Sequence, residues 1–178
     1  MKALLVIDVQ NGIVKMGDFA QELSIIDKLI EEFKQAKLPV IFMKHVVDEP
    51  ENSLFQASKG AELHESVRAY ADVVIEKQTP SSFYQTNLPV VLEEANVDHV
   101  FITGFNAEFC PQFTAIAAFD RGYQVTYIED AVGTVNTDDT YEMPGLDVKE
   151  FVSTALHWSS VIEVLDYEEY QEVYEELV

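Results

Sequence analysis

Short runs rich in apolar residues alternate with helical segments along this chain, and this alternation restricts the fold more than any other feature. The expected strands lie at residues 3–9, 40–43, 72–76, 100–103, 123–129 and 161–165. Such runs are typical of strands buried on both faces, as in parallel sheets. Helical patterns occupy residues 21–37, 62–70, 88–96, 111–120, 148–158 and 166–178. We therefore predict a three-layer α/β fold, a doubly wound parallel sheet of about six strands with helices on both faces.

The size and charge of the chain narrow its class and its partners. Its 178 residues suit a single domain, which we expect to span residues 1–178. It contains 32 acidic and 11 basic residues, which gives a net charge of −21. Because phosphate contacts need Lys and Arg, neither nucleic acid nor an anionic membrane is an expected partner.

The cysteine count and the apolar runs bear on the location of the protein. A single cysteine excludes an intrachain disulfide and fits a reducing compartment. The opening residues, MKALLVIDV, form too short an apolar stretch for a signal sequence. No run approaches the roughly 20 apolar residues of a membrane helix. We therefore expect a cytoplasmic protein.

Cys110, the only cysteine, stands at a predicted strand-to-helix turn. The expected strand at residues 100–103 is followed by Gly104 and a short loop, and Pro111 suits the first turn of the next helix. The free N–H groups and the positive dipole end of that helix favour a thiolate. A small buried core residue is the other interpretation of a lone cysteine.

Three reactive residues, Asp8, Lys77 and Cys110, fall at the carboxyl ends of separate predicted strands. Those ends share one edge of a parallel sheet, so the three side chains are expected to converge. A carboxylate can take the thiol proton, a lysine ammonium can orient the carboxylate, and N–H groups of the turn can bind an oxyanion. We expect Lys77 and the helix terminus to lower the thiol pKa, with Asp8 opposing them. Taken singly, the residues also fit a turn aspartate, a surface lysine and a core cysteine.

Four fragments carry a resemblance to a known family. They read LLVIDVQN, EKQTPSSFYQTNL, TGFNAEFCPQFTA and AAFDRGYQVTYIEDA, and they hold Asp8, Lys77 and Cys110 in this order. Together they resemble the isochorismatase-like cysteine hydrolases, a superfamily that includes nicotinamidases and N-carbamoyl amidohydrolases. The resemblance spans residues 3–164, nearly the whole chain.

The resemblance implies hydrolysis of a small carboxamide or related C–N bond through a thioester acyl-enzyme. Its catalytic triad would be Asp8, Lys77 and Cys110. It also implies a cis peptide bond between Phe105 and Asn106, and an oxyanion hole formed by the N–H groups of Asn106 and Cys110. For the substrate pocket we expect Gln10, Phe19, His45, Ser82 and Phe83. His45 fits a structural role equally well.

The fragments also bear on metals and on the choice of reaction. No metal or cofactor is expected, because the Asp-x-His pair of the nicotinamidase metal site has no match in VVDEPENS at residues 46–53. Family members that cleave the vinyl ether of isochorismate lack the thiol, so Cys110 argues against that reaction. Gly12, Pro111 and Ala117 depart from residues common in the family, which bears on substrate contacts.

Two other functions remain open at this point. One is a binding or scaffold protein without turnover, against which the intact set of three residues argues. The other is a thiol redox protein, against which the lack of a resolving cysteine argues. The expected partners are a small amide, water and further copies of the chain. The apolar stripe and tyrosines of the helix at residues 166–178 suggest an interface between copies.

Overall fold

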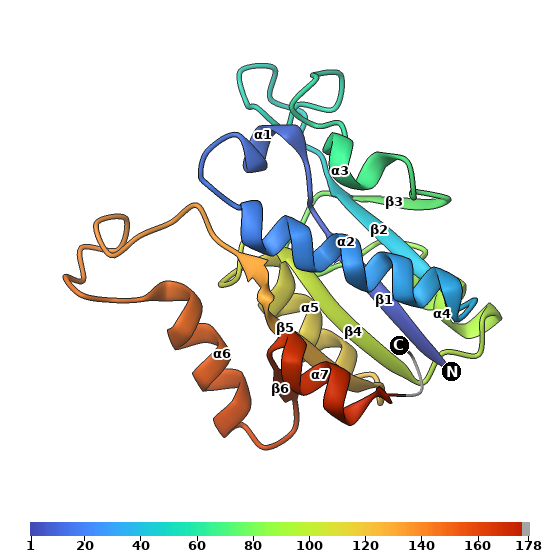
Figure 1. Cartoon of the computed structure of the whole chain (residues 1–178). Helices are drawn as coiled ribbons and strands as arrows, with labels where there is room; N and C mark the ends of the chain where they lie inside the picture. Colours follow the sequence, from blue (N-terminus) through green and yellow to red (C-terminus); the bar gives the residue numbers. More distant parts are fainter. Residues whose placement is uncertain (176–178) are drawn as a thin grey trace.

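The computed structural model describes residues 1–175, and its centre is one sheet of six parallel strands in the order β3-β2-β1-β4-β5-β6 (Figure 1). The strands are β1 Lys2–Ile7, β2 Val40–His45, β3 Val73–Lys77, β4 His99–Phe105, β5 Gln124–Gly133 and β6 Glu163–Leu165. The predicted doubly wound parallel sheet is confirmed. Strand order runs outward in both directions from β1 and β4, so the switch between these two strands is where such folds place ligands.

Helices cover both faces of the sheet, and each face has its own apolar cluster. The helices are α1 Asn11–Val14, α2 Ala20–Gln35, α3 Glu65–Arg68, α4 Leu88–Glu94, α5 Cys110–Phe119, α6 Val148–Trp158 and α7 Tyr167–Val173. Leu29 of α2 and Tyr170 of α7 belong to the cluster on one face. Leu92 of α4, Ala115 of α5 and Val152 of α6 belong to the cluster on the other. Among residues 1–175, no helix combines the length and the apolar character that crossing a bilayer requires.

Strand β1 brings the ends of its neighbours together. Residues Ala3 to Ile7 are completely buried, because helices cover both faces of this strand. The register pairs Ile7 with Met43 of β2 on one side and with Gly104 of β4 on the other. Lys77 pairs with His45 at the end of β3. The carboxyl ends of β1, β2, β3 and β4 therefore form one continuous edge.

Some element boundaries differ from the sequence-based expectation. Strand β5 continues beyond the expected residues 123–129, because a shift in register after Ile102 lets Val132 and Gly133 pair with the end of β4. Helix α1 was not predicted, since four residues are too few to show a helical period. The helix expected at residues 62–70 contains only the single turn of α3. The last part of the helix expected at residues 166–178 lies outside the described residues.

Helix α7 buries part of the apolar stripe that its sequence suggested for an interface. Tyr170 is completely buried, and its ring packs edge-on against Phe101 of β4 with 5.8 Å between centroids. Tyr174 packs against the same phenylalanine at 5.0 Å. These two tyrosines therefore belong to the core of their own chain, whereas Val173 of the same stripe is 56% exposed, and a contact between copies at α7 stays a prediction.

Candidate active site

Asp8 follows the last residue of β1 and is buried with one carboxylate oxygen unpaired. It is 1% exposed and has a φ of 54°, a left-handed conformation that turns its carboxylate out of the strand direction. Its N–H donates to the carbonyl of Met43 at 3.0 Å. Oδ2 accepts a hydrogen bond from the Lys77 ammonium at 2.7 Å, whereas Oδ1 has no partner within residues 1–175. Oδ1 is therefore free to accept a proton.

Lys77 is the last residue of β3 and uses all three of its ammonium hydrogens. It donates to Asp8 Oδ2 at 2.7 Å, to His45 Nδ1 at 3.2 Å and to the carbonyl of Thr79 at 3.3 Å. Burial disfavours the charged form, but Asp8 and Cys110 together raise the pKa of Lys77. Lys77 therefore stays charged at neutral pH and holds Asp8 in place.

His45 is fixed as one neutral tautomer by the same contact. Burial first, and then the Lys77 charge, lower the pKa of His45. An ammonium has no acceptor, so Nδ1 of the imidazole must receive the hydrogen bond from Lys77. The ring proton then resides on Nε2, which leaves that atom as a donor.

Cys110 opens α5 and lies next to these groups. Its Sγ, a carboxylate oxygen of Asp8 and a ring nitrogen of His45 all lie within 4.8 Å of one another. Burial, followed by the Asp8 charge, raises the pKa of the Cys110 thiol, and Lys77 opposes this only in part. The expected lowering of the thiol pKa is wrong, because at 8% exposure the loss of solvent outweighs the nearby cation. The thiol is neutral at rest, with a proton acceptor beside it.

The turn between β4 and Cys110 presents two free N–H groups. Gly104 has a φ of 112°, and a Cβ there would lie 1.9 Å from the carbonyl oxygen of Ile7, so only glycine fits. The peptide bond between Phe105 and Asn106 is cis. The N–H groups of Asn106 and Cys110 donate to no backbone carbonyl of residues 1–175. These are the two groups that the family resemblance implies for an oxyanion hole, and that role stays a prediction.

Comparison with known proteins supplies the family. The family model described as the isochorismatase domain matches residues 2–149. This chain belongs to the isochorismatase family. The family protein YddQ of Bacillus subtilis is 32% identical over 139 residues, which cover 74% of this chain and 77% of YddQ. Nicotinamidase 3 of Arabidopsis thaliana is 28% identical over 150 residues, 76% of this chain and 75% of that protein.

A solved structure extends the likeness to the whole fold. A crystal structure named as an isochorismatase from Burkholderia xenovorans superposes with a TM-score of 0.88 and 26% identity. The match covers 99% of this chain and 88% of that one. The resemblance deduced from the four sequence fragments is confirmed, and the chain is a hydrolase of this family.

Glu108, in the loop before Cys110, holds a set of hydrogen bonds that sequence analysis missed. Its Oε1 accepts hydrogen bonds from Thr134 Oγ1 at 3.1 Å, Asn136 Nδ2 at 2.6 Å and the Tyr141 hydroxyl at 2.9 Å. The loop before Cys110 is thus tied to the segment that follows β5. The available signal was that Glu108 is the only charged residue between positions 100 and 119.

Among the five residues expected in the substrate pocket, His45 is the one whose side chain hydrogen-bonds to a member of the predicted triad. The Gln10 side chain donates to the carbonyls of His45 and Ala61, both at 2.8 Å, and accepts from the His45 N–H at 2.9 Å. It therefore braces the end of β1 against β2 and the loop beyond. As a substrate contact, Gln10 stays a prediction.

The other three expected pocket residues lie in buried contacts. Ser82 Oγ accepts from Thr114 Oγ1 at 2.9 Å, which joins its loop to α5. Phe83 belongs to the cluster beneath α4 and α5. Phe19 packs edge-on against Phe105 with 4.8 Å between ring centroids. Their place in a substrate pocket likewise stays a prediction.

The residues present do not favour a resident metal. Within residues 1–175, the grouped metal-ligating atoms belong to Asp8, His45 and Cys110. The Lys77 ammonium contacts the first two of these at 2.7 and 3.2 Å, so a positive charge already occupies the position next to them. A divalent cation would be repelled there. We assign no step of the reaction to a metal.

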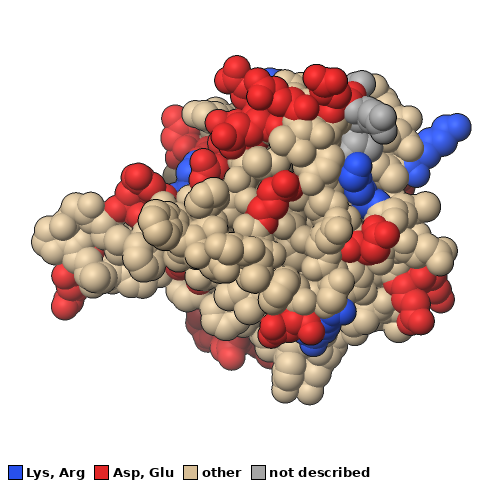
Figure 2. Space-filling view, turned by 90° about the horizontal axis from the view of Figure 1, so that it is seen from below, with Lys and Arg blue, Asp and Glu red and all other residues tan. Residues whose placement is uncertain are grey.

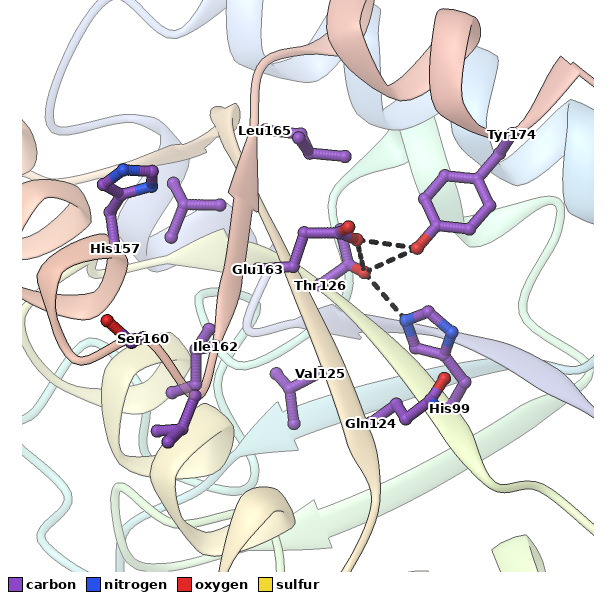
Figure 3. A pocket seen from close by; sticks show the side chains of 12 residues that line it. His99, Gln124, Val125, Thr126, His157, Ser160, Ile162, Glu163, Leu165 and Tyr174 are labelled. Carbon is purple, nitrogen blue, oxygen red and sulfur yellow. Dashed lines mark hydrogen bonds between the residues drawn. The ribbon is translucent and has the colours of Figure 1, made fainter.

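Two of the hollows in the molecule lie at opposite ends of the parallel strands. One of about 250 Å³ lies against Lys77 and is lined also by Val46, Thr79 and Tyr84, so it adjoins the candidate site. A larger one of about 600 Å³ lies at the amino ends of β4, β5 and β6 (Figure 3). There the hydroxyl of Thr126 bonds to His99 Nε2 at 2.7 Å and to Glu163 Oε2 at 2.5 Å. His99, Thr126, Glu163 and Tyr174 of the larger hollow are hydrogen-bonded to one another, and none of them has a buried unpaired atom like Oδ1 of Asp8.

Proposed function

We propose that this isochorismatase-family enzyme hydrolyses a small carboxamide, or a related C–N bond, through a thioester on Cys110. The observation that carries the proposal is that the two oxygens of the Asp8 carboxylate have different surroundings. Oδ2 is held by Lys77, Oδ1 is buried and unpaired within residues 1–175, and a carboxylate oxygen of Asp8 lies within 4.8 Å of the Cys110 Sγ. The relative named as a nicotinamidase supports an amide as the substrate class.

In the first half-reaction, Asp8 Oδ1 takes the thiol proton as Sγ attacks the carbonyl carbon of the substrate. A C–S bond forms, and the carbonyl oxygen becomes an oxyanion. The N–H groups of Asn106 and Cys110 are free to donate to that oxygen. The raised pKa of the Cys110 thiol means that no thiolate accumulates at rest, so proton transfer accompanies the attack.

Collapse of this intermediate breaks the C–N bond, and the protonated Asp8 gives its proton to the departing nitrogen. Ammonia or an amine leaves, and the acyl group remains on Cys110. Asp8 then takes a proton from water, and the oxygen of that water attacks the thioester carbonyl. The C–S bond breaks, and the thiol regains its proton from Asp8. The net reaction converts an amide and water into a carboxylic acid and an amine.

Lys77 serves this sequence without exchanging a proton. Its three donors stay on Asp8, His45 and Thr79, so its positive charge is fixed beside a carboxylate that is charged and neutral in turn. His45 Nε2–H is a donor for a polar group of the substrate. We assign these roles to a single hydrolase domain without cofactor, acting in the cytoplasm. Its partners are a small amide, water and further copies of the chain.

Trapping the acyl-enzyme tests the proposal. The protein is mixed with each member of a panel of small amides, ureides and nicotinamide. The reaction is quenched in acid, and the mass of the protein is measured by mass spectrometry. We expect release of ammonia or amine, and an acyl mass on the peptide that contains Cys110. The matched Cys110→Ser variant should give neither. Turnover retained in Cys110→Ser, or no turnover and no adduct across the panel, would overturn the proposal in favour of a non-catalytic protein.

A further inference from the structure

Residues 133–141 lie against the turn that precedes α5, and we call this segment the strap. The N–H of Ala107 in the turn donates to the carbonyl of Gly133 at 2.9 Å. In the other direction, the N–H of Val135 donates to Asn106 Oδ1 at 3.2 Å. In Figure 1 the strap begins at the end of β5 and leads into the long loop before α6. The strap therefore binds two consecutive residues of the turn, one through its backbone and one through its side chain.

Glu108, the next residue of the turn, forms three further bonds to the strap. Its Oε1 accepts from Thr134 Oγ1 at 3.1 Å, from Asn136 Nδ2 at 2.6 Å and from the Tyr141 hydroxyl at 2.9 Å. Hydrogen bonds to an ionised acceptor are roughly twice as strong as bonds between neutral groups. Burial and the hydrogen bond to Glu108 raise the pKa of Tyr141 to about 12, so its hydroxyl keeps the proton that it donates. One carboxylate oxygen thus connects the turn to three residues of the strap.

Glu108 differs from most carboxylates of this acidic chain. Most Asp and Glu side chains are exposed to water, as Figure 2 shows for the surface seen from below. Glu108 is half-buried, forms no ion pair with a Lys or Arg of residues 1–175, and has a buried Oε2 without a partner there. Such an arrangement of a carboxylate costs stability. Proteins tolerate unsatisfied groups of this kind chiefly at functional sites.

We infer that Glu108 is a positioning residue for the hydrolysis proposed above, and that it holds the turn so that the Asn106 N–H points at the oxyanion. This role, which rests on the proposed function, is exerted through the turn and not on the substrate. Asn106 is bound to the strap through Oδ1, and its N–H donates to no backbone carbonyl of residues 1–175. Since Glu108 is bound to the same strap, the turn is restrained on both sides of Ala107. An oxyanion donor must lie within about 3 Å of the oxygen, and a displacement of about 1 Å can lower the rate by about 10²-fold.

The Cys110 thiol is governed by other groups. Burial, the Asp8 charge and the Lys77 charge are the main influences on the pKa of Cys110. Loss of Glu108 should therefore leave the ionisation of the thiol unchanged, whereas loss of Asp8 should change it. Amide hydrolysis passes through an oxyanion, but alkylation by iodoacetamide does not, because the sulfur displaces iodide from a CH₂ carbon. The two reactions of Cys110 can thus separate an effect on the oxyanion from an effect on the nucleophile.

Steady-state kinetics on the amide identified by the panel, together with iodoacetamide labelling of Cys110, test this role. In Glu108→Ala, kcat should fall by about 10²-fold and KM should change by less than about threefold, because only the transition state contains the oxyanion. The rate of labelling should stay within about twofold of the wild type, and its pH midpoint should not move. Glu108→Gln should recover most of the lost kcat, because its carboxamide oxygen can still accept from the strap.

Two further variants act on the surroundings of Glu108. Tyr141→Phe removes one of the three donors of the strap, and kcat should fall by about three- to tenfold. This smaller change tests the same contact if Glu108→Ala does not fold. The matched control is Tyr127→Phe. Burial and the Glu108 charge raise the pKa of Tyr127, but its buried hydroxyl has no partner within residues 1–175. Its loss breaks no bond to the strap and should change kcat by less than about threefold.

Circular dichroism checks that every variant is folded. A wild type without turnover would overturn the proposed function, and the role of Glu108 with it. With an active wild type, full turnover in Glu108→Ala or, where that variant does not fold, in Tyr141→Phe would overturn the role of Glu108 alone. Faster labelling of Cys110 or a lower midpoint in Glu108→Ala would also overturn it, because the whole site would then have opened. So would an equal loss of kcat in Tyr127→Phe, or a Glu108→Gln variant no more active than Glu108→Ala.

Discussion

The two ends of the parallel strands hold networks of polar side chains that are used in opposite ways. At the carboxyl ends, His45, Lys77 and Asp8 form a chain of hydrogen bonds next to Cys110, and Oδ1 of Asp8 has no partner within residues 1–175. At the amino edge, His99, Thr126, Glu163 and Tyr174 form a chain in which Glu163 Oε2 accepts from both hydroxyls, at 2.5 and 2.6 Å (Figure 3). An unpaired buried acceptor reduces stability. The unpaired acceptor at Asp8 belongs to the candidate reactive site. The fully paired network around Thr126 instead suits a structural role.

The largest effect expected from this comparison is on turnover. Asp8→Asn should lower kcat/KM by about 10³- to 10⁴-fold, because an amide cannot take the thiol proton. Thr126→Val removes the hydroxyl at the centre of the amino-edge network and should change kcat/KM by less than about threefold. Steady-state kinetics on the amide identified by the panel measure both. Equal losses in the two variants would mean that the edges do not differ in function.

The next largest effect is on the free energy of unfolding, and its size also differs between the two networks. Lys77→Met leaves Asp8 buried at 1% exposure without its cation, which should lower the free energy of unfolding by about 3–5 kcal/mol. Thr126→Val leaves His99 without its hydroxyl partner and should lower it by only about 1–3 kcal/mol. Urea titration followed by circular dichroism gives both values. A Lys77→Met variant as stable as the wild type would show that the ion pair is absent in solution.

From the sequence alone we could predict which residues stand at the carboxyl ends of the strands. Asp8, Lys77 and Cys110 were identifiable because parallel strands end at a common edge and because apolar runs mark those strands. The sheet followed from the same signal. The end of β5 could not be predicted from this signal, since the register shift after Ile102 depends on the backbone around Gly104.

The electrostatics of the site could not be deduced from sequence. The sequence predicted the neighbours of Cys110 but not its 8% exposure. Burial decides whether the pKa of the thiol is raised or lowered. The partner that the tyrosines of α7 contact could not be deduced from sequence for a similar reason. Tyr170 has the spacing of an interface residue, but Phe101 on the underlying strand receives it. Thr126 gave no signal, because one hydroxyl in a strand is common.

The smallest expected effect is on pH dependence, and both networks contribute to it. Burial lowers the pKa of His99, and burial with the Lys77 charge lowers that of His45. The unfolded state therefore binds more protons, so stability is fully present above about pH 6.5 and is lost as the pH falls below that value. Urea midpoints at pH 7.5 and 5.5 should differ less in His99→Gln than in the wild type. An unchanged difference would show that His99 is not the titrating group.

Asp8, Lys77 and Cys110 share one buried site. Iodoacetamide labelling of Cys110 as a function of pH tests this arrangement most directly. In the wild type, the midpoint of the labelling rate should lie above the ordinary thiol value of about 8.5, as burial and Asp8 raise the pKa of Cys110. Asp8→Asn should move the midpoint down, and Lys77→Met should move it further up. One ordinary thiol curve, the same in the wild type and in both variants, would contradict the account.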